Sequence, residues 1–274
     1  MSQQPPDRPP YTERPRESRA AAIARLYDLD LAEEPGDVDL YVAMAQRTGG
    51  PILELGVGSA RVAVPLAEAG HGVVGVDLDR AMLDRARARA AASGVSIELI
   101  EGDLLRLAAL PEVVRSGPYK LAIFPLNSIL LLASPDAQRA ALAGMSSALA
   151  PGGLAVVDTW LATPADLGAL DGRLSHEWLR TDPETGLEVT KTVAAWYDPV
   201  RRMVTLTSIF DEGAPGEPPL RWTRQDAMRL VTVDELVSYA EAAGLEIERL
   251  AGDYDLTPLD AGSDRVVLVA RKPG

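Results

Sequence analysis

Two glycines and a downstream carboxylate are the residues whose types and spacing point most directly to chemistry. Gly56 and Gly58 follow a short aliphatic run, and Asp77 ends the next such run, about the separation at which a carboxylate meets a ribose diol. Glycines at the carboxyl end of a parallel strand let backbone amides approach a bound cofactor closely. The pair predicts a cofactor site, although tight strand-to-helix turns also use glycine without a ligand.

The third glycine of the dinucleotide-binding fingerprint is absent. Arg61 occupies that position, which weakens the fit to a pyrophosphate. Asp103 adds a carboxylate after the third aliphatic run, where it would accept a hydrogen bond from an adenine amino group. An acid at such a point also commonly caps the next segment, so both interpretations of Asp103 stay open.

These residues need a sheet whose strands end together, and the pattern from Pro51 onward provides one. Short runs rich in valine, isoleucine and leucine alternate with helical stretches, which is typical of a mostly parallel sheet covered by helices on both faces. The predicted strands are Ile52 to Leu55, Val73 to Asp77, Ser96 to Ile100, Tyr119 to Phe124, Leu154 to Trp160, Leu245 to Leu250 and Arg265 to Arg271. The predicted helices are Arg61 to Ala69, Ala81 to Ser93, Asp136 to Leu149 and Val233 to Ala243.

Beyond Trp160 the pattern changes to alternating apolar and polar residues. The runs Leu187 to Tyr197 and Met203 to Asp211 predict an antiparallel hairpin, and Leu220 to Val231 predicts a further strand. The predicted organisation is a proline-rich, disordered or loosely docked arm over residues 1–18, a cofactor-binding core with N-terminal helices over 19–160, inserted strands over 161–231 that cap an acceptor site, and a return to the core sheet over 232–274. The fold class is therefore α/β, with a seven-stranded, mostly parallel sheet and an inserted small antiparallel β subdomain.

Several motifs together resemble the Rossmann-like S-adenosylmethionine-dependent methyltransferase family, in its small-molecule branch. The resemblance covers about Leu26 to Trp160 and Thr232 to Lys272. Its motifs are Leu53-Glu54-Leu55-Gly56-Val57-Gly58-Ser59-Ala60-Arg61, Gly75-Val76-Asp77-Leu78-Asp79 with Met82-Leu83, Gly102-Asp103, Asn127-Ser128, Leu149-Ala150-Pro151-Gly152-Gly153 and Ala243-Gly244-Leu245. It implies S-adenosylmethionine as the cofactor and methyl transfer to a nitrogen or oxygen of a small molecule.

The resemblance also implies roles for individual residues. Tyr27 would close over the cofactor, Asp77 would hold its ribose, and Met82 would pack on its adenine. Arg61 is either a donor to the methionyl carboxylate or a solvated residue of the first helical turn. The implied cofactor-binding set is Tyr27, Glu54, Gly56, Gly58, Arg61, Asp77, Leu78, Met82, Gly102, Asp103, Leu104, Phe124 and Leu126.

The chain departs from the family pattern at Ala60, where a third glycine is usual, and at Val57, where a smaller residue is common. An alanine at position 60 is accommodated if its φ stays negative. The departure gives slight support to a non-catalytic cofactor-binding protein as an alternative function. The other alternative is a nicotinamide-dependent oxidoreductase that uses the same crevice, against which Arg61 and Asp103 both argue.

Methyl transfer from a sulfonium mainly requires alignment in a dry pocket, so a dedicated base is optional. The candidate catalytic residues are His176, Asn127 and Tyr254. His176 lies among the inserted strands, where a surface role is the alternative, and Asn127 follows the fourth strand. The other histidine, His71, precedes the second strand at the far end of the sheet, so we expect a structural or exposed position for it.

Composition limits the partners. The net charge of −13 disfavours nucleic acid and anionic membranes, and the chain has no cysteine and no metal-ligand spacing, so no metal is expected. No signal peptide or membrane span is apparent, which favours a cytoplasmic location. The expected partner is a small-molecule acceptor, and a homodimer formed through the arm or the inserted strands stays open.

Overall fold

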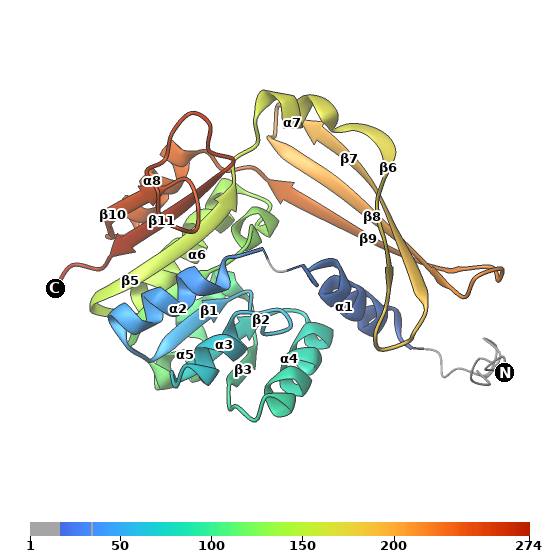
Figure 1. Cartoon of the computed structure of the whole chain (residues 1–274). Helices are drawn as coiled ribbons and strands as arrows, with labels where there is room; N and C mark the ends of the chain where they lie inside the picture. The colour runs from blue at the N-terminus through green and yellow to red at the C-terminus, as the bar shows by residue number, and fades with distance from the viewer. Residues whose placement is uncertain (1–16, 34) are drawn as a thin grey trace.

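The computed structural model describes residues 17–33 and 35–274. The predicted arm over residues 1–18 lies outside the described residues except for its last two positions. Figure 1 shows a helix-covered sheet beside a second, long-stranded sheet, with helix α1 (Arg19–Asp30) between them. Within the described part of the chain, no helix is both long and apolar enough to cross a membrane.

Sheet A has seven strands in the order β10-β11-β5-β4-β1-β2-β3. Strands β1 to β5 pair in parallel, and β11 is antiparallel to both of its neighbours. This confirms the predicted α/β fold class and its mostly parallel seven-stranded sheet. The strands are β1 (Ile52–Leu55), β2 (Val73–Asp77), β3 (Glu98–Glu101), β4 (Tyr119–Phe124), β5 (Leu149–Trp160), β10 (Glu246–Ala251) and β11 (Arg265–Arg271).

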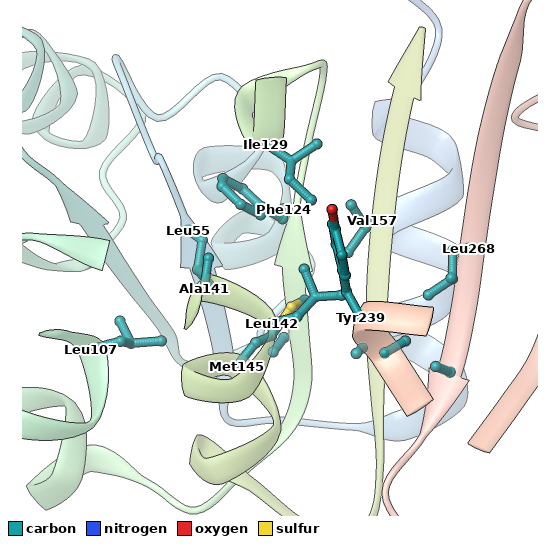
Figure 2. Packing of buried hydrophobic residues seen from close by; sticks show 14 of the residues in the cluster. Leu55, Leu107, Phe124, Ile129, Ala141, Leu142, Met145, Val157, Tyr239 and Leu268 are labelled. Atoms are coloured by element: carbon teal, nitrogen blue, oxygen red, sulfur yellow. The ribbon is translucent and has the colours of Figure 1, made fainter. Parts of the chain in front are cut away.

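Adjacent residues of the buried strands face opposite sides of sheet A, which explains why both faces carry helices. Ile52 packs in the cluster beneath α2 (Val38–Thr48), α3 (Ala63–Glu68) and α4 (Arg80–Ala92). Leu53 packs in the cluster beneath α5 (Pro111–Ser116), α6 (Pro135–Ala148) and α8 (Val233–Ala242). Figure 2 shows part of the second cluster, with Phe124 among Leu55, Ile129 and Leu142.

Sheet B consists of four antiparallel strands in the order β6-β7-β8-β9. They are β6 (Asp171–Thr181), β7 (Glu188–Asp198), β8 (Met203–Gly213) and β9 (Leu220–Arg229), preceded by the short helix α7 (Pro164–Ala169). The predicted hairpin corresponds to β7 and β8. Strand β6 was not predicted, because this edge strand is exposed almost throughout and has no clear apolar alternation.

The start of β5 differs from the prediction. The Ala150-Pro151-Gly152-Gly153 segment was expected to lie before the strand as the end of a helix, whereas β5 already begins at Leu149. Lys272 at the end of β11 pairs through its backbone with Gly152 and Gly153, at 2.8 and 2.9 Å, which extends the sheet to these residues. Pairing with a distant strand therefore overrides the local turn propensity of the sequence.

Helix α1 is tied by charged side chains to both sheet B and α4. On the sheet B side, the buried Arg25 donates to Asp182 and Glu212, and it also donates to Glu17 just before α1. On the α4 side, Asp28 accepts from Arg85 at 2.6 Å. The ring of Trp178 packs with Phe210 of sheet B and donates through Nε1 to Asp30 at 2.9 Å. Helix α1 is consequently a fixed wall between the two sheets.

The end of β9 is anchored to α6 and α8 by the buried Arg229. Its guanidinium donates to Glu235 at 2.7 Å and to Gln138 at 2.8 Å. Burial opposes the charge on Glu235, but hydrogen bonds from Arg229, the Thr232 backbone and Arg202 outweigh it and lower the pKa of Glu235 to about 2. This ion pair joins sheet B to the helices that cover sheet A.

The lowered pKa of Glu235 makes the contribution of this ion pair to stability depend on pH. Because the folded-state pKa of Glu235 lies below the unfolded value of 4.5, its contribution is full above pH 4.5 and is lost as pH falls toward about 2. We expect Glu235→Gln to lower the melting temperature at pH 7 by an amount that shrinks as pH falls through this window. Calorimetric melts from pH 7 to pH 3 would check this, with the exposed Glu241→Gln on the same helix as the control.

Candidate functional site

A narrow cavity lies at the carboxyl end of β1, where the glycine-containing turn leads toward α3. Backbone and side-chain atoms from the turn, from α1 and from the segment after β4 form its walls. The lining residues are Tyr27, Glu54, Gly56, Val57, Gly58, Ser59, Arg61, Val62, Pro125, Leu126 and Ser128. The structure thus brings together six of the predicted cofactor residues, Tyr27, Glu54, Gly56, Gly58, Arg61 and Leu126.

The turn requires glycine at two positions. Gly56 and Gly58 have φ values of 66° and 53°, which L side chains rarely adopt. A Cβ at Gly56 would lie 3.4 Å from Ser128, and a Cβ at Gly58 would meet only one atom, at 4.0 Å. Gly58 therefore leaves open space in the cavity wall that a bound molecule can approach.

Ala60 corrects one expectation. Its φ is 62°, so it adopts the left-handed conformation that the missing glycine would have favoured, and not the expected negative φ. Its methyl group is fully buried, and its backbone N–H donates to Val57 at 2.9 Å. The conformation costs a non-glycine residue about 1 kcal/mol or more, which the surrounding packing must offset.

Glu54 is the most unusual group in this cavity. Its side chain is 2 % exposed, and its Oε2 atom has no hydrogen-bond partner among the described residues. Burial raises the pKa of Glu54 well above its usual range, opposed in part by the nearby Arg61 charge. A buried acceptor without a donor is costly, so a cationic or N–H-bearing ligand group would complete this site.

Arg61 has a largely buried side chain that is paired with a carboxylate. Its side chain is 15 % exposed, and its Nη1 and Nη2 atoms lie 2.6 and 2.7 Å from the two oxygens of the fully buried Asp37. The predicted solvated alternative is therefore wrong. The bidentate pair fixes the guanidinium at the cavity wall and leaves it further N–H donors for a ligand carboxylate.

Asp77 ends β2 beside the turn. Its Oδ2 accepts from the Gly58 backbone at 2.8 Å, and its Oδ1 accepts from the Asp79 backbone at 2.9 Å. Burial raises the pKa of Asp77, while these backbone hydrogen bonds oppose the shift. Next to it Leu78 is 71 % exposed and Met82 is buried. Each carboxylate oxygen retains a lone pair, and Leu78 presents an uncovered apolar surface.

The remaining predicted cofactor residues have structural partners. Asp103 accepts from the Leu105 backbone at 2.9 Å and so caps the following 3₁₀ segment, as its alternative interpretation proposed. A Cβ at Gly102 would come within 2.6 Å of Leu110. Leu104 is partly buried against the core cluster, and Phe124 is fully buried within it (Figure 2).

A second, larger cavity of about 240 Å³ adjoins the first and shares Tyr27, Leu126 and Ser128 with it. Helix α1, the segment after β4 and the inner face of sheet B enclose it. Its lining residues are Ile23, Tyr27, Asp30, Leu31, Leu126, Asn127, Ser128, Leu131, Lys191, Leu206, Ser208, Phe210, Arg224, Asp226 and Met228. Its volume is somewhat below the about 300 Å³ at which typical small-molecule sites begin, so it would suit a small acceptor.

Two ion pairs face this second cavity. Lys191 Nζ lies 2.6 Å from Asp30 and 2.7 Å from Glu177. Arg224 lies 2.8 Å from Asp226 and stacks over the Tyr27 ring at 5.4 Å. No hydrogen bond within the described chain engages the hydroxyl groups of Tyr27, Ser128 and Ser208. The cavity therefore combines balanced charge with free hydroxyl groups, a lining suited to a polar molecule.

The three predicted catalytic residues have separate locations. Asn127 lines the second cavity, and its Oδ1 accepts from the Trp160 backbone at 2.6 Å. His176 is exposed on β6 opposite Thr192, the residue after Lys191, and so lies on the outer face of sheet B. Tyr254 donates to Asp158 at 3.0 Å behind the site. Of these three residues, only Asn127 lines one of the two cavities described above.

Several site residues were missed by sequence reasoning. Asp30, Lys191, Arg224 and Asp226 come from α1 and sheet B, far apart in the chain, and no local motif marks them. Asp158 did carry a signal, because it is a carboxylate near the end of a buried aliphatic strand. It is fully buried and accepts from the Leu126 backbone, 2.9 Å away.

Comparison with known proteins agrees with this geometry. Residues 52–153 match the model of a methyltransferase domain. The cypemycin N-terminal methyltransferase of a Streptomyces species is 25 % identical over 82 % of this chain and 84 % of its own length. The CcbJ methyltransferase structure from Streptomyces caelestis is 26 % identical, with a TM-score of 0.70, over 88 % of this chain and 97 % of that one. The ribosomal protein L11 methyltransferase of Thermus thermophilus is 35 % identical over 44 % of this chain, but the match spans only 42 % of that enzyme.

The nucleotide-type turn at the end of β1, the seven-stranded sheet and the methyltransferase domain define the class of the protein. This chain is a Rossmann-like S-adenosylmethionine-dependent methyltransferase, which confirms the family, the cofactor and the enzymatic character that the motifs predicted. The orphaned Glu54 carboxylate and the open wall at Gly58 fit a cofactor that carries an ammonium group.

Proposed function

We propose that this enzyme methylates a nitrogen atom of a small polar molecule held in the second cavity. The adjoining position of the two cavities is the single observation that carries the proposal, because Tyr27, Leu126 and Ser128 contribute to both. A donor in one cavity and an acceptor in the other would therefore meet at these three residues. The alignment of the two molecules supplies most of the rate enhancement.

Residues of the first cavity, and those that follow β2 and β3 beside it, would take roles that match their free bonding capacity. Glu54 would accept from the methionyl ammonium, and Arg61 would donate to the methionyl carboxylate. Asp77 retains acceptor sites for the ribose hydroxyls, and the exposed Leu78 would lie against adenine with Met82 beside it. Asp103 and Gly102 would contribute only to the shape of this end, because their own contacts are structural.

Bound S-adenosylmethionine supplies a methyl group on a positively charged sulfur. The acceptor lone pair would form the new bond to this carbon as the carbon–sulfur bond breaks with its electron pair left on sulfur, and the cavity residues would hold the two molecules in line. A neutral amine loses one proton after the transfer, to a cavity carboxylate or to water. Asp30 and Asp226 line this cavity and would stabilise the positive charge that develops on a methylated amine, which supports a nitrogen acceptor. The cypemycin relative is named an N-terminal methyltransferase, and a nitrogen acceptor in this chain is compatible with that name.

The test has a binding step and a turnover step. Isothermal titration with S-adenosylhomocysteine should give micromolar affinity, whereas NADH should not bind. Incubation with S-adenosylmethionine and matched small amines and alcohols, followed by mass spectrometry, should show one added methyl group on an amine. Methylation of the alcohols alone would overturn the nitrogen assignment, and cofactor binding without any turnover would favour a non-catalytic protein.

Filling the second cavity should separate acceptor binding from cofactor binding. Ser208 is buried and lines this cavity, so Ser208→Leu should raise the KM for the amine by at least about tenfold, since a few added carbons in a pocket are worth about 1–3 kcal/mol. The affinity for S-adenosylhomocysteine should stay unchanged. Steady-state kinetics and titration measure the two effects.

The neighbouring residue provides the control. Thr207 accepts from Gln225 on the outer face of sheet B, at 3.2 Å, so Thr207→Leu places the same leucine side chain outside the cavity. Its KM should match that of the unmodified enzyme. An equal rise of KM in both variants would place the acceptor elsewhere.

A further inference from the structure

The segment that separates the two cavities has an unfavourable backbone conformation. Leu126 and Asn127, directly after β4, have φ values of 47° and 63°. Asparagine tolerates the left-handed region, whereas a branched apolar residue such as leucine rarely adopts it. Contacts from elsewhere in the fold must therefore hold this segment in place.

The end of β5 supplies those contacts. The Leu126 backbone N–H donates to Asp158 Oδ1 at 2.9 Å, and the Asn127 backbone N–H donates to the Asp158 carbonyl oxygen at 3.3 Å. In return, the Trp160 backbone N–H donates to Asn127 Oδ1 at 2.6 Å. Both residues of the segment are thus fastened to β5, and Asp158 provides two of the three hydrogen bonds.

Asp158 is itself fixed from several sides. Its carboxylate is fully buried and accepts from the Tyr41 hydroxyl on α2 and from the Tyr254 hydroxyl after β10, the latter at 3.0 Å. Arg265 of β11 donates to Tyr254 and lies 3.8 Å from Asp158. Its Oδ1 atom accepts from both the Leu126 backbone and the Tyr41 hydroxyl, and its Oδ2 atom accepts from the Tyr254 hydroxyl. Neither Asp158 nor Tyr41 lines either cavity.

We propose that Asp158 is a positioning residue, which holds the Leu126–Asn127 segment between the donor and acceptor cavities. Leu126 lines both cavities and Asn127 lines the larger one, so a shift of this segment changes the distance between donor and acceptor. Tyr41 acts on the segment indirectly, because its hydroxyl orients the Asp158 oxygen that accepts from the Leu126 N–H. The inference rests on the proposed function for its effect on turnover, but not for its effect on the segment.

The first experiment measures the segment without any acceptor. Asp158→Asn keeps the shape of the side chain but leaves one acceptor oxygen in place of two. We expect hydrogen exchange of the Leu126 and Asn127 amides, followed by NMR on the full chain, to become at least about tenfold faster. Unchanged exchange at both amides would overturn the proposal, whatever the reaction proves to be.

The second experiment compares two buried tyrosines that each lose one hydrogen bond. Tyr41→Phe removes a donor to Asp158, whereas Tyr119→Phe removes a donor to the Val113 carbonyl at 3.0 Å, at the opposite end of β4. Both variants should lose similar thermal stability. Only Tyr41→Phe and Asp158→Asn should lower kcat, by about tenfold or more, because small misplacements of reacting groups are costly.

The affinity for S-adenosylhomocysteine should stay within about threefold in all three variants, since Asp158 does not line the cofactor cavity. Equal kcat losses in Tyr41→Phe and Tyr119→Phe would mean that general destabilisation is the cause and would overturn the proposal. If the unmodified enzyme methylates no amine or alcohol, the proposed function fails, and the exchange rates alone decide the role of Asp158.

Discussion

Glu54→Gln is expected to lower the affinity for S-adenosylmethionine and S-adenosylhomocysteine by at least about thirtyfold, since truncating one partner of a buried charge pair costs about 2 kcal/mol or more. The physical reason is that Glu54 Oε2 has no partner among the described residues and lines the narrow cavity. A glutamine amide keeps the size of the side chain but carries no charge for an ammonium group. Isothermal titration at pH 7 measures the loss, with the exposed Glu68→Gln as the control.

The same substitution should stabilise the protein without ligand. The pKa of Glu54 is raised in the folded state, so the unfolded chain releases its proton first and the free energy of unfolding falls as pH rises above the unfolded value of 4.5. Glu54→Gln removes this dependence, and its melting temperature at pH 8 should exceed that of the unmodified protein. Weaker binding together with higher stability is the signature of a group retained for a ligand. Lower stability with unchanged affinity would contradict the assignment.

Arg25→Met is expected to cost about 3–5 kcal/mol of stability, because it leaves buried carboxylates without a counter-ion. Arg25 bonds Asp182 and Glu212, which join α1 to sheet B, and also Glu17, which lies just before α1. The proposed acceptor cavity lies between those two elements, so turnover should fall more than the affinity for S-adenosylhomocysteine. Chemical denaturation and steady-state kinetics measure the two effects.

Arg19→Met on the same helix is the matched control. Arg19 is exposed and, among the described residues, donates only to the Thr223 carbonyl, at 2.6 Å, so its loss should change stability by less than about 1 kcal/mol. A second variant, Arg25→Lys, keeps the charge but not the planar array of donors and should fall between the two. An Arg25→Met protein as stable as the Arg19→Met protein would show that the buried charges do not anchor α1.

The sequence was most informative where local patterns decide the structure. The strands from Val73 to Asp77, from Tyr119 to Phe124 and from Arg265 to Arg271 were predicted to the residue, because buried parallel and central strands form continuous aliphatic runs. The turn at Gly56 and Gly58 was located for the same reason, since its position after a strand has few alternatives. The roles of the cofactor residues stay predictions until binding is measured.

The acceptor side was hidden for an equally physical reason. Lys191 and Asp30 are separated by 161 positions and meet only because α1 packs on the inner face of sheet B. The face of sheet B on which His176 lies depends on the register between β6 and β7. This register shifts on both sides of the segment from Leu174 to His176. A one-residue change of register reverses the face of every side chain, and sequence alone does not determine it. The homodimer and the cytoplasmic location also stay predictions.

The two cavities draw on different parts of the chain. Apart from Tyr27, the narrow cavity is built from sheet A and its loops, whereas most of the larger one is built from α1 and sheet B. Mutations in the inserted strands can therefore alter which molecule is accepted while the methyl-donor pocket keeps its sequence. On the proposed function, such a division makes β7, β8 and β9 a separate surface on which new acceptor specificities can evolve.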